Sequence, residues 1–461
     1  MRIEIEQSTT LRPAPHRRYF PIPNAAGPLG RFARLYADEP ANCRRDWRKF
    51  AAVAANLGLL LAVFRAYHVE GRAFQILAAL GFAAWPVHYL APFAWKKPLF
   101  VAASVAGLAA VFGWSVAAVV LPVAALLIGV CYLPLAWSAR AGIIAAAALG
   151  MALVRGGLVG GSLPDGLWPV LGTMFMFRMM IYLYELKHAK KRESLVDTLS
   201  YFFLLPNYCF LHFPVVDYRT MQRGYFSRDI HSIQQAGLGM ILRGTVQLLM
   251  YRLVYHGLLI SAEEVAGPAS LAGYLACNYL LYLRVSGQFH VACGMLHLFG
   301  FALPETHHNY LLANSFTDYW RRINIYWKDF MVRLVFNPVA FRLKRRPQWQ
   351  ALAAATTVVF VVTWALHAYQ SFWLRGSWGL SLPDCLFWGI LGVLVLVNVQ
   401  LDARRPRRRT APGSRPSPAE FALRAAKTAG TFATICILWS LWSSPSVEAW
   451  MGLWRRALGG A

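Results

Sequence analysis

Long apolar runs separated by short polar segments dominate the pattern of the chain. The segment 351–374, ALAAATTVVFVVTWALHAYQSFWL, contains no Asp, Glu, Lys or Arg and is long enough to cross a bilayer as a helix. Solid apolar runs predict membrane helices, because the strands of a membrane β-barrel would alternate apolar and polar residues. The pattern predicts helical spans over 50–66, 74–94, 98–113, 116–137, 141–160, 167–186, 235–260, 268–284, 286–303, 351–374, 383–401 and 420–443.

The composition supports this class. Hydrophobic residues make up 57 % and charged residues 15 % of the 461 positions, a combination that soluble proteins of this length rarely have. We therefore expect an all-α polytopic membrane protein. It divides into a basic N-terminal arm (1–49), N-terminal membrane helices (50–166), a core (167–401) and a C-terminal region (402–461) with a basic loop, a last membrane helix and an amphipathic segment.

The net charge of +25 comes from basic tracts placed between the apolar runs. Such tracts follow the positive-inside rule, so the expected partners are membrane lipids and not nucleic acid. Loops 160–166 and 261–267 carry no Lys or Arg and fall on the other side by counting spans. We expect a multi-pass protein of the inner (cytoplasmic) membrane with its N-terminus in the cytoplasm.

One narrow polar stripe marks the otherwise apolar run 351–374. His367 shares a helical face with Thr363, Trp364, Gln370 and Ser371, which lie three or four residues away. Helical rise places this histidine about 24 Å from the start of the run. Ionisable residues at such depth are costly and mark functional sites, so His367 is a candidate; the alternative is a structural histidine bonded to a neighbouring helix.

Two other groups of histidines have simpler explanations. His290, Cys293 and His297 lie on one face of a helix and are possible zinc ligands, but no fourth ligand accompanies them. We expect them to pack or to line a polar cavity, and we predict no metal site and no tightly bound cofactor. The adjacent histidines of ETHHNY (305–310) point to different faces, which favours a solvated loop.

The segment 202–226, FFLLPNYCFLHFPVVDYRTMQRGYF, interrupts the apolar pattern. Pro206 and Pro214 break any helix there, and polar residues surround them: Asn207, His212, Asp217 and Arg219. Broken backbone at membrane depth needs cover from protein or a water-filled cavity, so a re-entrant segment is predicted.

The segment 315–334, SFTDYWRRINIYWKDFMVRL, is amphipathic on a helical wheel. One face carries Phe316, Trp320, Ile323, Trp327, Phe330 and Leu334; the other carries Arg321, Arg322, Lys328 and Asp329. This pattern predicts an interfacial helix. It does not explain Asn324 at the border of the two faces, because asparagine is a poor helix former.

Several of these segments together resemble the membrane-bound O-acyltransferase family. The resemblance covers about 167–401 and rests on GTMFMFRMMIYLYELKHAKK, FFLLPNYCFLHFPVVDYRTM, DYWRRINIYWKDFM and TWALHAYQSFWLRGSWGLSLPDCLFWGILG. It implies a bundle of about eleven to thirteen membrane helices with a re-entrant segment and interfacial amphipathic helices. Residues 167–401 would form the catalytic core.

The implied reaction is transfer of an acyl group from a thioester to a hydroxyl. The family's histidine maps onto His367, as general base, and its upstream polar position onto Asn324, as hydrogen-bond partner. Ala368 stands where bacterial members usually have Gly, and Asn324 where they usually have His, so the subfamily and substrate stay open. The residues expected to contact the substrates or the donor are Trp320, Arg321, Arg322, Lys328, Trp364, Gln370 and Ser371; the cations fit lipid phosphates equally well.

The resemblance implies acyl-CoA or an acyl carrier as the thioester donor, with an acetyl or other short acyl group. The acceptor would be a hydroxyl of an envelope polysaccharide, a lipid or a secreted molecule, and a periplasmic esterase-like protein or a carrier protein would be a partner. Two alternatives stay open: a transporter or channel that uses His367 and the re-entrant segment as a polar path, and an inactive family member that acts as a membrane scaffold.

Overall fold

A computed structural model describes residues 39–459, except 162, 189–192, 211–215 and 405–416. The described part is helical, and its single bridge of strand type joins Tyr225 and Phe301. The longer helices are α2 (Trp47–Ala66), α3 (Arg72–Leu90), α4 (Phe93–Tyr132), α5 (Trp137–Arg155), α6 (Met176–Leu186), α9 (Ile230–Leu253), α10 (Pro268–Leu280), α11 (Leu283–Leu298), α15 (Gln348–Arg375), α16 (Leu382–Arg404), α17 (Pro418–Ser443) and α18 (Val447–Ala457).

Shorter helical elements connect these. They are η1 (Ala41–Cys43), η2 (Pro169–Phe175), α7 (Leu195–Phe202), η3 (Leu205–Tyr208), α8 (Tyr218–Gly224), η4 (Val254–Leu258), η5 (Ala262–Glu264), η6 (Tyr310–Leu312), α12 (Phe316–Arg322), α13 (Ile325–Met331), η7 (Val332–Phe336) and α14 (Asn337–Arg342).

Within the described residues, seven helices are long and apolar enough to cross a membrane: α2, α3, α4, α5, α15, α16 and α17. The prediction of a polytopic helical membrane protein is therefore confirmed. The other predicted spans, 167–186, 235–260, 268–284 and 286–303, are also largely helical. Their helices are not among the seven, either because they are shorter or because polar residues interrupt them.

Helix α4 contains two of the predicted spans. Gly113 has φ 84° and ψ 163°, which is not helical and which a residue with a Cβ rarely adopts. The element therefore consists of two helices that meet at Gly113, matching the predicted boundary between 98–113 and 116–137.

The predicted break within 202–226 is also present. Helix α7 ends at Phe202, and a short turn, η3, contains the buried residues Pro206 and Asn207 before α8 begins at Tyr218. Asp217 caps α8 by accepting a hydrogen bond from the backbone N–H of Thr220 at 2.8 Å. His212 and Pro214 lie outside the described residues.

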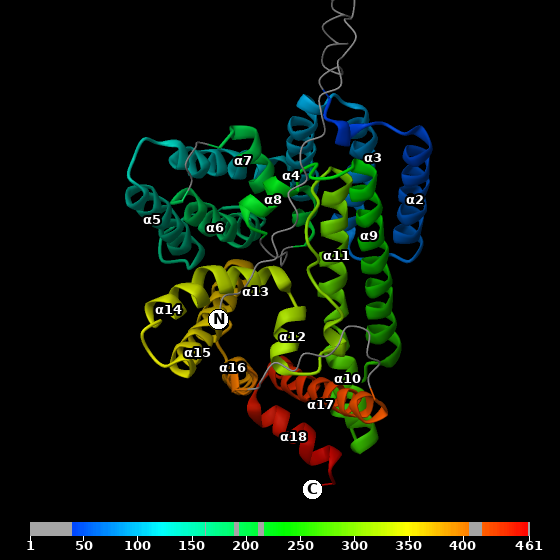
Figure 1. Cartoon of the computed structure of the whole chain (residues 1–461), viewed down its shortest axis with the longest axis vertical. Helices are drawn as coiled ribbons and strands as arrows, with labels where there is room; N and C mark the ends of the chain where they lie inside the picture. The colour runs from blue at the N-terminus through cyan, green and yellow to red at the C-terminus, as the bar shows by residue number, and fades with distance from the viewer. Residues whose placement is uncertain (1–38, 162, 189–192, 211–215, 405–416, 460–461) are drawn as a thin grey trace, which may run out of the picture.

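Helices α9 and α11 lie side by side in Figure 1 and approach closely through glycines. A Cβ placed on Gly244 would lie 2.5 Å from the carbonyl oxygen of Gly287, and one on Gly294 would lie 2.5 Å from that of Gly237. Small residues at seven-residue spacing on both helices thus bring the two backbones into contact.

The C-terminal half surrounds the site described below. Helices α12, α13, α15, α16 and α17 contribute to one hydrophobic cluster, while Tyr326 of α13 and Phe372 and Trp373 of α15 pack into the cluster of the N-terminal helices. In Figure 1, α12 to α16 lie on the opposite side of α11 from α2, with α17 and α18 at the lower end. Leu453 and Ala457 of α18 are buried while Arg455 and Arg456 are exposed, so this helix has an apolar and a basic face.

Candidate functional site

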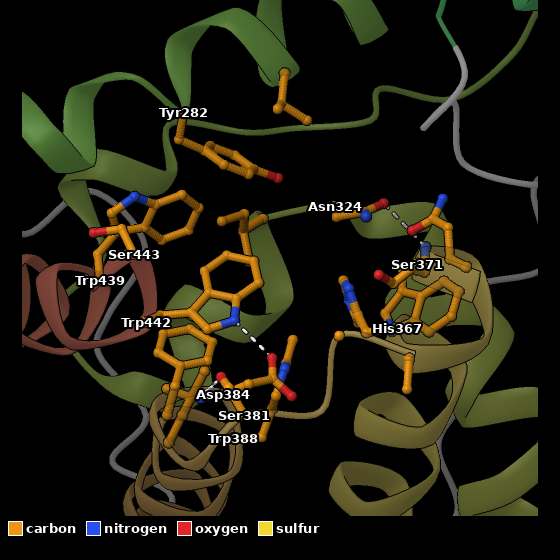
Figure 2. A pocket seen from close by; sticks show the side chains of 18 of the residues that line it. Tyr282, Asn324, His367, Ser371, Ser381, Asp384, Trp388, Trp439, Trp442 and Ser443 are labelled. Atoms are coloured by element: carbon orange, nitrogen blue, oxygen red, sulfur yellow. Dashed lines mark hydrogen bonds between the residues drawn. The ribbon is translucent and has the colours of Figure 1, made fainter. Parts of the chain in front are cut away.

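A cavity of about 550 Å³ lies among the helices of the C-terminal half (Figure 2). Its wall comes from the α10–α11 junction, α12, α13, α15, α16 and α17. The volume lies in the range typical of small-molecule sites, and the wall combines many aromatic side chains with several polar groups. Of the predicted site residues, the wall includes Trp320, Asn324, Lys328, His367, Gln370 and Ser371.

His367 lies in this wall, on α15, among tryptophans. Its ring centroid is 4.7 Å from that of Trp388 and 5.7 Å from that of Trp327. Gln370 and Ser371, one turn further along the same face, also line the cavity. The polar stripe predicted from 351–374 therefore faces a space that a ligand can occupy.

Three buried hydrogen-bond donors in the wall have no partner among the described residues. They are the Ser371 hydroxyl and the indole N–H groups of Trp327 and Trp388. A buried donor without a partner costs about 1–3 kcal/mol, and a ligand or water in the cavity could accept hydrogen bonds from these three groups.

The prediction of one helix over 315–334 is wrong at Asn324. Helix α12 ends at Arg322 and α13 begins at Ile325, because Asn324 adopts the left-handed conformation with φ 40° and ψ 62°. Asparagine enters this conformation more readily than most residues. Its side-chain oxygen caps α13 by accepting a hydrogen bond from the backbone N–H of Trp327 at 3.3 Å.

This capping role explains why an asparagine occupies position 324, which the amphipathic pattern does not explain. It also fixes the orientation of the side chain: because the oxygen caps the helix, the amide NH₂ is the group left to donate hydrogen bonds. Asn324 therefore has a structural role and lines the cavity at the same time.

The three predicted cations have different surroundings. Lys328 lines the cavity and forms an ion pair with Asp329 at 2.5 Å. Arg322 pairs with Asp318 on its own helix at 2.7 Å, and Arg321 is exposed; neither belongs to the wall. Only Lys328 of this set is therefore placed to meet a ligand in the cavity.

Asp384, in the first turn of α16, is a wall residue that the sequence analysis missed. Its carboxylate accepts a hydrogen bond from the indole N–H of Trp442 at 2.7 Å (Figure 2). It accepts a second one from the indole N–H of Trp364 at 2.6 Å. Trp364 thus stands behind the wall, and the carboxylate ties α15, α16 and α17 together. The only sequence signal was an acid at the start of an apolar run, which is also typical of an ordinary helix N-terminus.

The histidines of α11 are buried and packed. His290 Nδ1 lies 2.8 Å from the Gln247 side-chain oxygen, and His297 Nδ1 lies 2.8 Å from the Cys293 carbonyl oxygen. In the described part of the chain no group of three or more His, Cys, Asp or Glu side chains is placed to hold a metal. The expectation of a solvated loop at 305–310 is wrong for His307, which is 1 % exposed, while His308 is exposed.

Comparison with known proteins gives no family model and no curated protein that matches this chain.

Proposed function

We propose that the protein is a membrane-embedded O-acyltransferase that moves an acyl group, acetyl or another short one, from a thioester to a hydroxyl. The observation that carries this proposal is that His367 and Asn324, distant in sequence, line one aromatic cavity. An imidazole can take a proton near neutral pH, and a neutral amide N–H can stabilise a developing oxyanion. The resemblance to the membrane-bound O-acyltransferase family in 167–401 supports the same assignment.

In the proposed reaction, His367 is the general base. The acceptor oxygen attacks the thioester carbonyl carbon while its proton moves to the imidazole, and the carbonyl electron pair moves onto the carbonyl oxygen. The Asn324 amide donates to that oxyanion. Collapse of this tetrahedral intermediate re-forms the carbonyl and breaks the carbon–sulfur bond. The imidazolium proton then neutralises the thiolate. No acyl group is carried by the protein at any step.

The rest of the wall fits the two substrates. Trp320, Gln370 and Ser371 offer apolar contact and hydrogen bonds around the reacting groups. Lys328 offers a positive charge to the phosphates of a coenzyme A or of a phosphopantetheine arm. Arg321 and Arg322, outside the wall, suit the phosphates of lipid headgroups.

The protein would form a bundle of about eleven to thirteen membrane helices with a re-entrant segment at 202–226. It would lie in the inner (cytoplasmic) membrane with its N-terminus in the cytoplasm. The acceptor would be a hydroxyl of an envelope polysaccharide, a lipid or a secreted molecule. A periplasmic esterase-like protein or an acyl-carrier protein would be the partner.

The experiment is thiol release by the purified full-length protein from acetyl-CoA and longer acyl-CoAs, with glycerol and a hexose as model acceptors. We expect release above background, and its loss in His367→Ala at an unchanged unfolding temperature. Release that His367→Ala leaves unchanged would contradict the mechanism. No release from any donor, including an acyl-carrier protein, would favour a transporter or an inactive scaffold.

A further inference from the structure

Tyr282 brings a second polar group to the cavity. It lies at the α10–α11 junction and belongs to the wall, and in Figure 2 its hydroxyl points into the space toward Asn324. The hydroxyl oxygen is 2.9 Å from Nε2 of His307. The cavity wall therefore contains a tyrosine whose hydroxyl is held by a buried histidine.

His307 is itself held on its other side. Nδ1 lies 3.2 Å from the hydroxyl oxygen of Thr306, and both side chains are buried. Burial, and then the neighbouring His290, lower the pKa of His307 well below its ordinary value, so the ring is neutral. A neutral imidazole has one donor and one acceptor nitrogen. When Nδ1 accepts from Thr306, Nε2–H donates to the Tyr282 oxygen and leaves the phenol proton to donate into the cavity.

The loop that carries His307 also holds the turn at Asn324. The Ile325 N–H donates to the Thr306 carbonyl oxygen at 2.7 Å, and the His308 N–H donates to the Arg322 carbonyl oxygen at 3.0 Å. These bonds lie on either side of Asn324 in the chain. One loop therefore sets the positions of two cavity donors, the Asn324 amide and the Tyr282 hydroxyl.

We propose that Tyr282 is a further catalytic residue, a second hydrogen-bond donor to the oxyanion, and that His307 is its positioning residue. This inference rests on the proposed acyl transfer. When the acceptor oxygen adds to the thioester carbonyl, negative charge develops on the carbonyl oxygen, and Tyr282 donates to it without giving up its proton. The proton of the acceptor still goes to His367, and the electron pair of the breaking carbon–sulfur bond still goes to sulfur.

The first test is Tyr282→Phe, which removes the hydroxyl and keeps the ring. We expect kcat for thiol release to fall about 10²-fold, as for loss of one oxyanion donor, with little change in the KM for acyl-CoA. Tyr310→Phe is the matched control. Tyr310 also packs against His307 and is buried, but its hydroxyl lies 3.1 Å from that of Ser286 and it does not belong to the wall. We expect its kcat to stay within about twofold of wild type, since it loses no oxyanion donor.

The second test addresses His307. His307→Leu removes the donor to Tyr282 and should lower kcat, whereas His307→Gln, whose amide can donate, should recover part of it. The double variant Tyr282→Phe/His307→Leu should be no slower than Tyr282→Phe alone, because both changes remove one function. Unfolding temperatures normalise each rate to folded protein.

The outcomes separate the two proposals. Wild-type release that depends on His367 but is unaffected by Tyr282→Phe overturns this inference and leaves acyl transfer standing. Additive losses in the double variant overturn the positioning role of His307. If the wild-type protein shows no thiol release that depends on His367, both proposals lose their basis.

Discussion

Helices α9 and α11 touch through glycines, whereas the helices around the cavity are kept apart by tryptophans. At the first interface, Gly244 and Gly287 bring the backbones so close that a Cβ finds no room. At the second, the rings of Trp327, Trp388 and Trp442 stand around His367 and leave a cavity of about 550 Å³. Both regions contain histidines within largely apolar helices.

The difference lies in what surrounds each histidine. His290 and His297 are 2 % and 0 % exposed and lie on α11, which packs closely against α9. His367 is partly exposed and lines the cavity. A polar residue in a closed helix interface contributes to structure, and one in the wall of a cavity is available for chemistry.

The largest effect is expected from a variant that disrupts the contact of α9 and α11 through their glycines. Gly244→Ala places a Cβ 2.5 Å from a backbone oxygen of α11, which the structure can relieve only by separating the helices. We expect a loss of about 3 kcal/mol or more, and little folded protein, by thermal unfolding in detergent. Gly239→Ala is the control on the same helix: nothing lies within 4 Å of its Cβ, and it should stabilise α9 by about 0.5–1 kcal/mol. Equal effects would show that the close approach does not stabilise the fold.

Asn324→Gly separates the structural and chemical roles of the asparagine. Glycine keeps the left-handed turn and costs only a few tenths of a kcal/mol as a helix cap, but it has no amide donor. We expect a nearly unchanged unfolding temperature and a fall in kcat of about 10²-fold in the thiol-release assay. Asn314→Gly, at an exposed asparagine outside the cavity, is the control. Wild-type kcat in Asn324→Gly would leave Asn324 with a structural role alone.

Asp384→Asn tests whether the positions of α15, α16 and α17 around the cavity depend on the carboxylate that joins them. An amide has one acceptor oxygen, so its NH₂ must face one of the two indole N–H donors now bonded to the carboxylate. We expect a loss of about 1–3 kcal/mol in the free energy of unfolding and about tenfold lower activity. Asp402→Asn, at an exposed acid on the same helix, should change neither. Unaltered stability in Asp384→Asn would mean that the helices are fixed by ring packing.

The smallest effect concerns Lys328. Replacing it with Met keeps most of its apolar length and removes the charge in the wall. We expect the KM for acyl-CoA to rise about fivefold, equivalent to about 1 kcal/mol for a partly exposed ion pair, with kcat retained. The exposed Lys344→Met is the control. An unchanged KM would place the phosphates of the donor elsewhere.

Much of the fold could be predicted because it follows from local pattern. Apolar length predicted α15 and α16, and the prolines predicted the break before α8. The bend at Gly113 fell at the predicted boundary between two spans. The polar stripe on α15 identified His367 as a candidate. The structure shows that His367 lines a cavity.

The rest depends on contacts that no local pattern contains. The turn at Asn324 depends on hydrogen bonds from the loop that precedes α12, which override the amphipathic periodicity of 315–334. Asp384 acquires its role only when Trp364 and Trp442 arrive from two other helices. The buried ring of His307 likewise contacts Tyr282, 25 positions earlier in the chain.

The role of His367 as general base is tested by two histidine variants measured side by side, His367→Ala and His290→Ala, for thiol release per folded molecule and for unfolding temperature. We predict that His367→Ala loses about 10²–10⁴-fold in rate at a nearly unchanged unfolding temperature. We predict the opposite for His290→Ala: destabilisation by about 1–3 kcal/mol, with the rate per folded molecule retained. A wild-type rate in His367→Ala, or the loss of rate in His290→Ala instead, would show that His367 is not the general base.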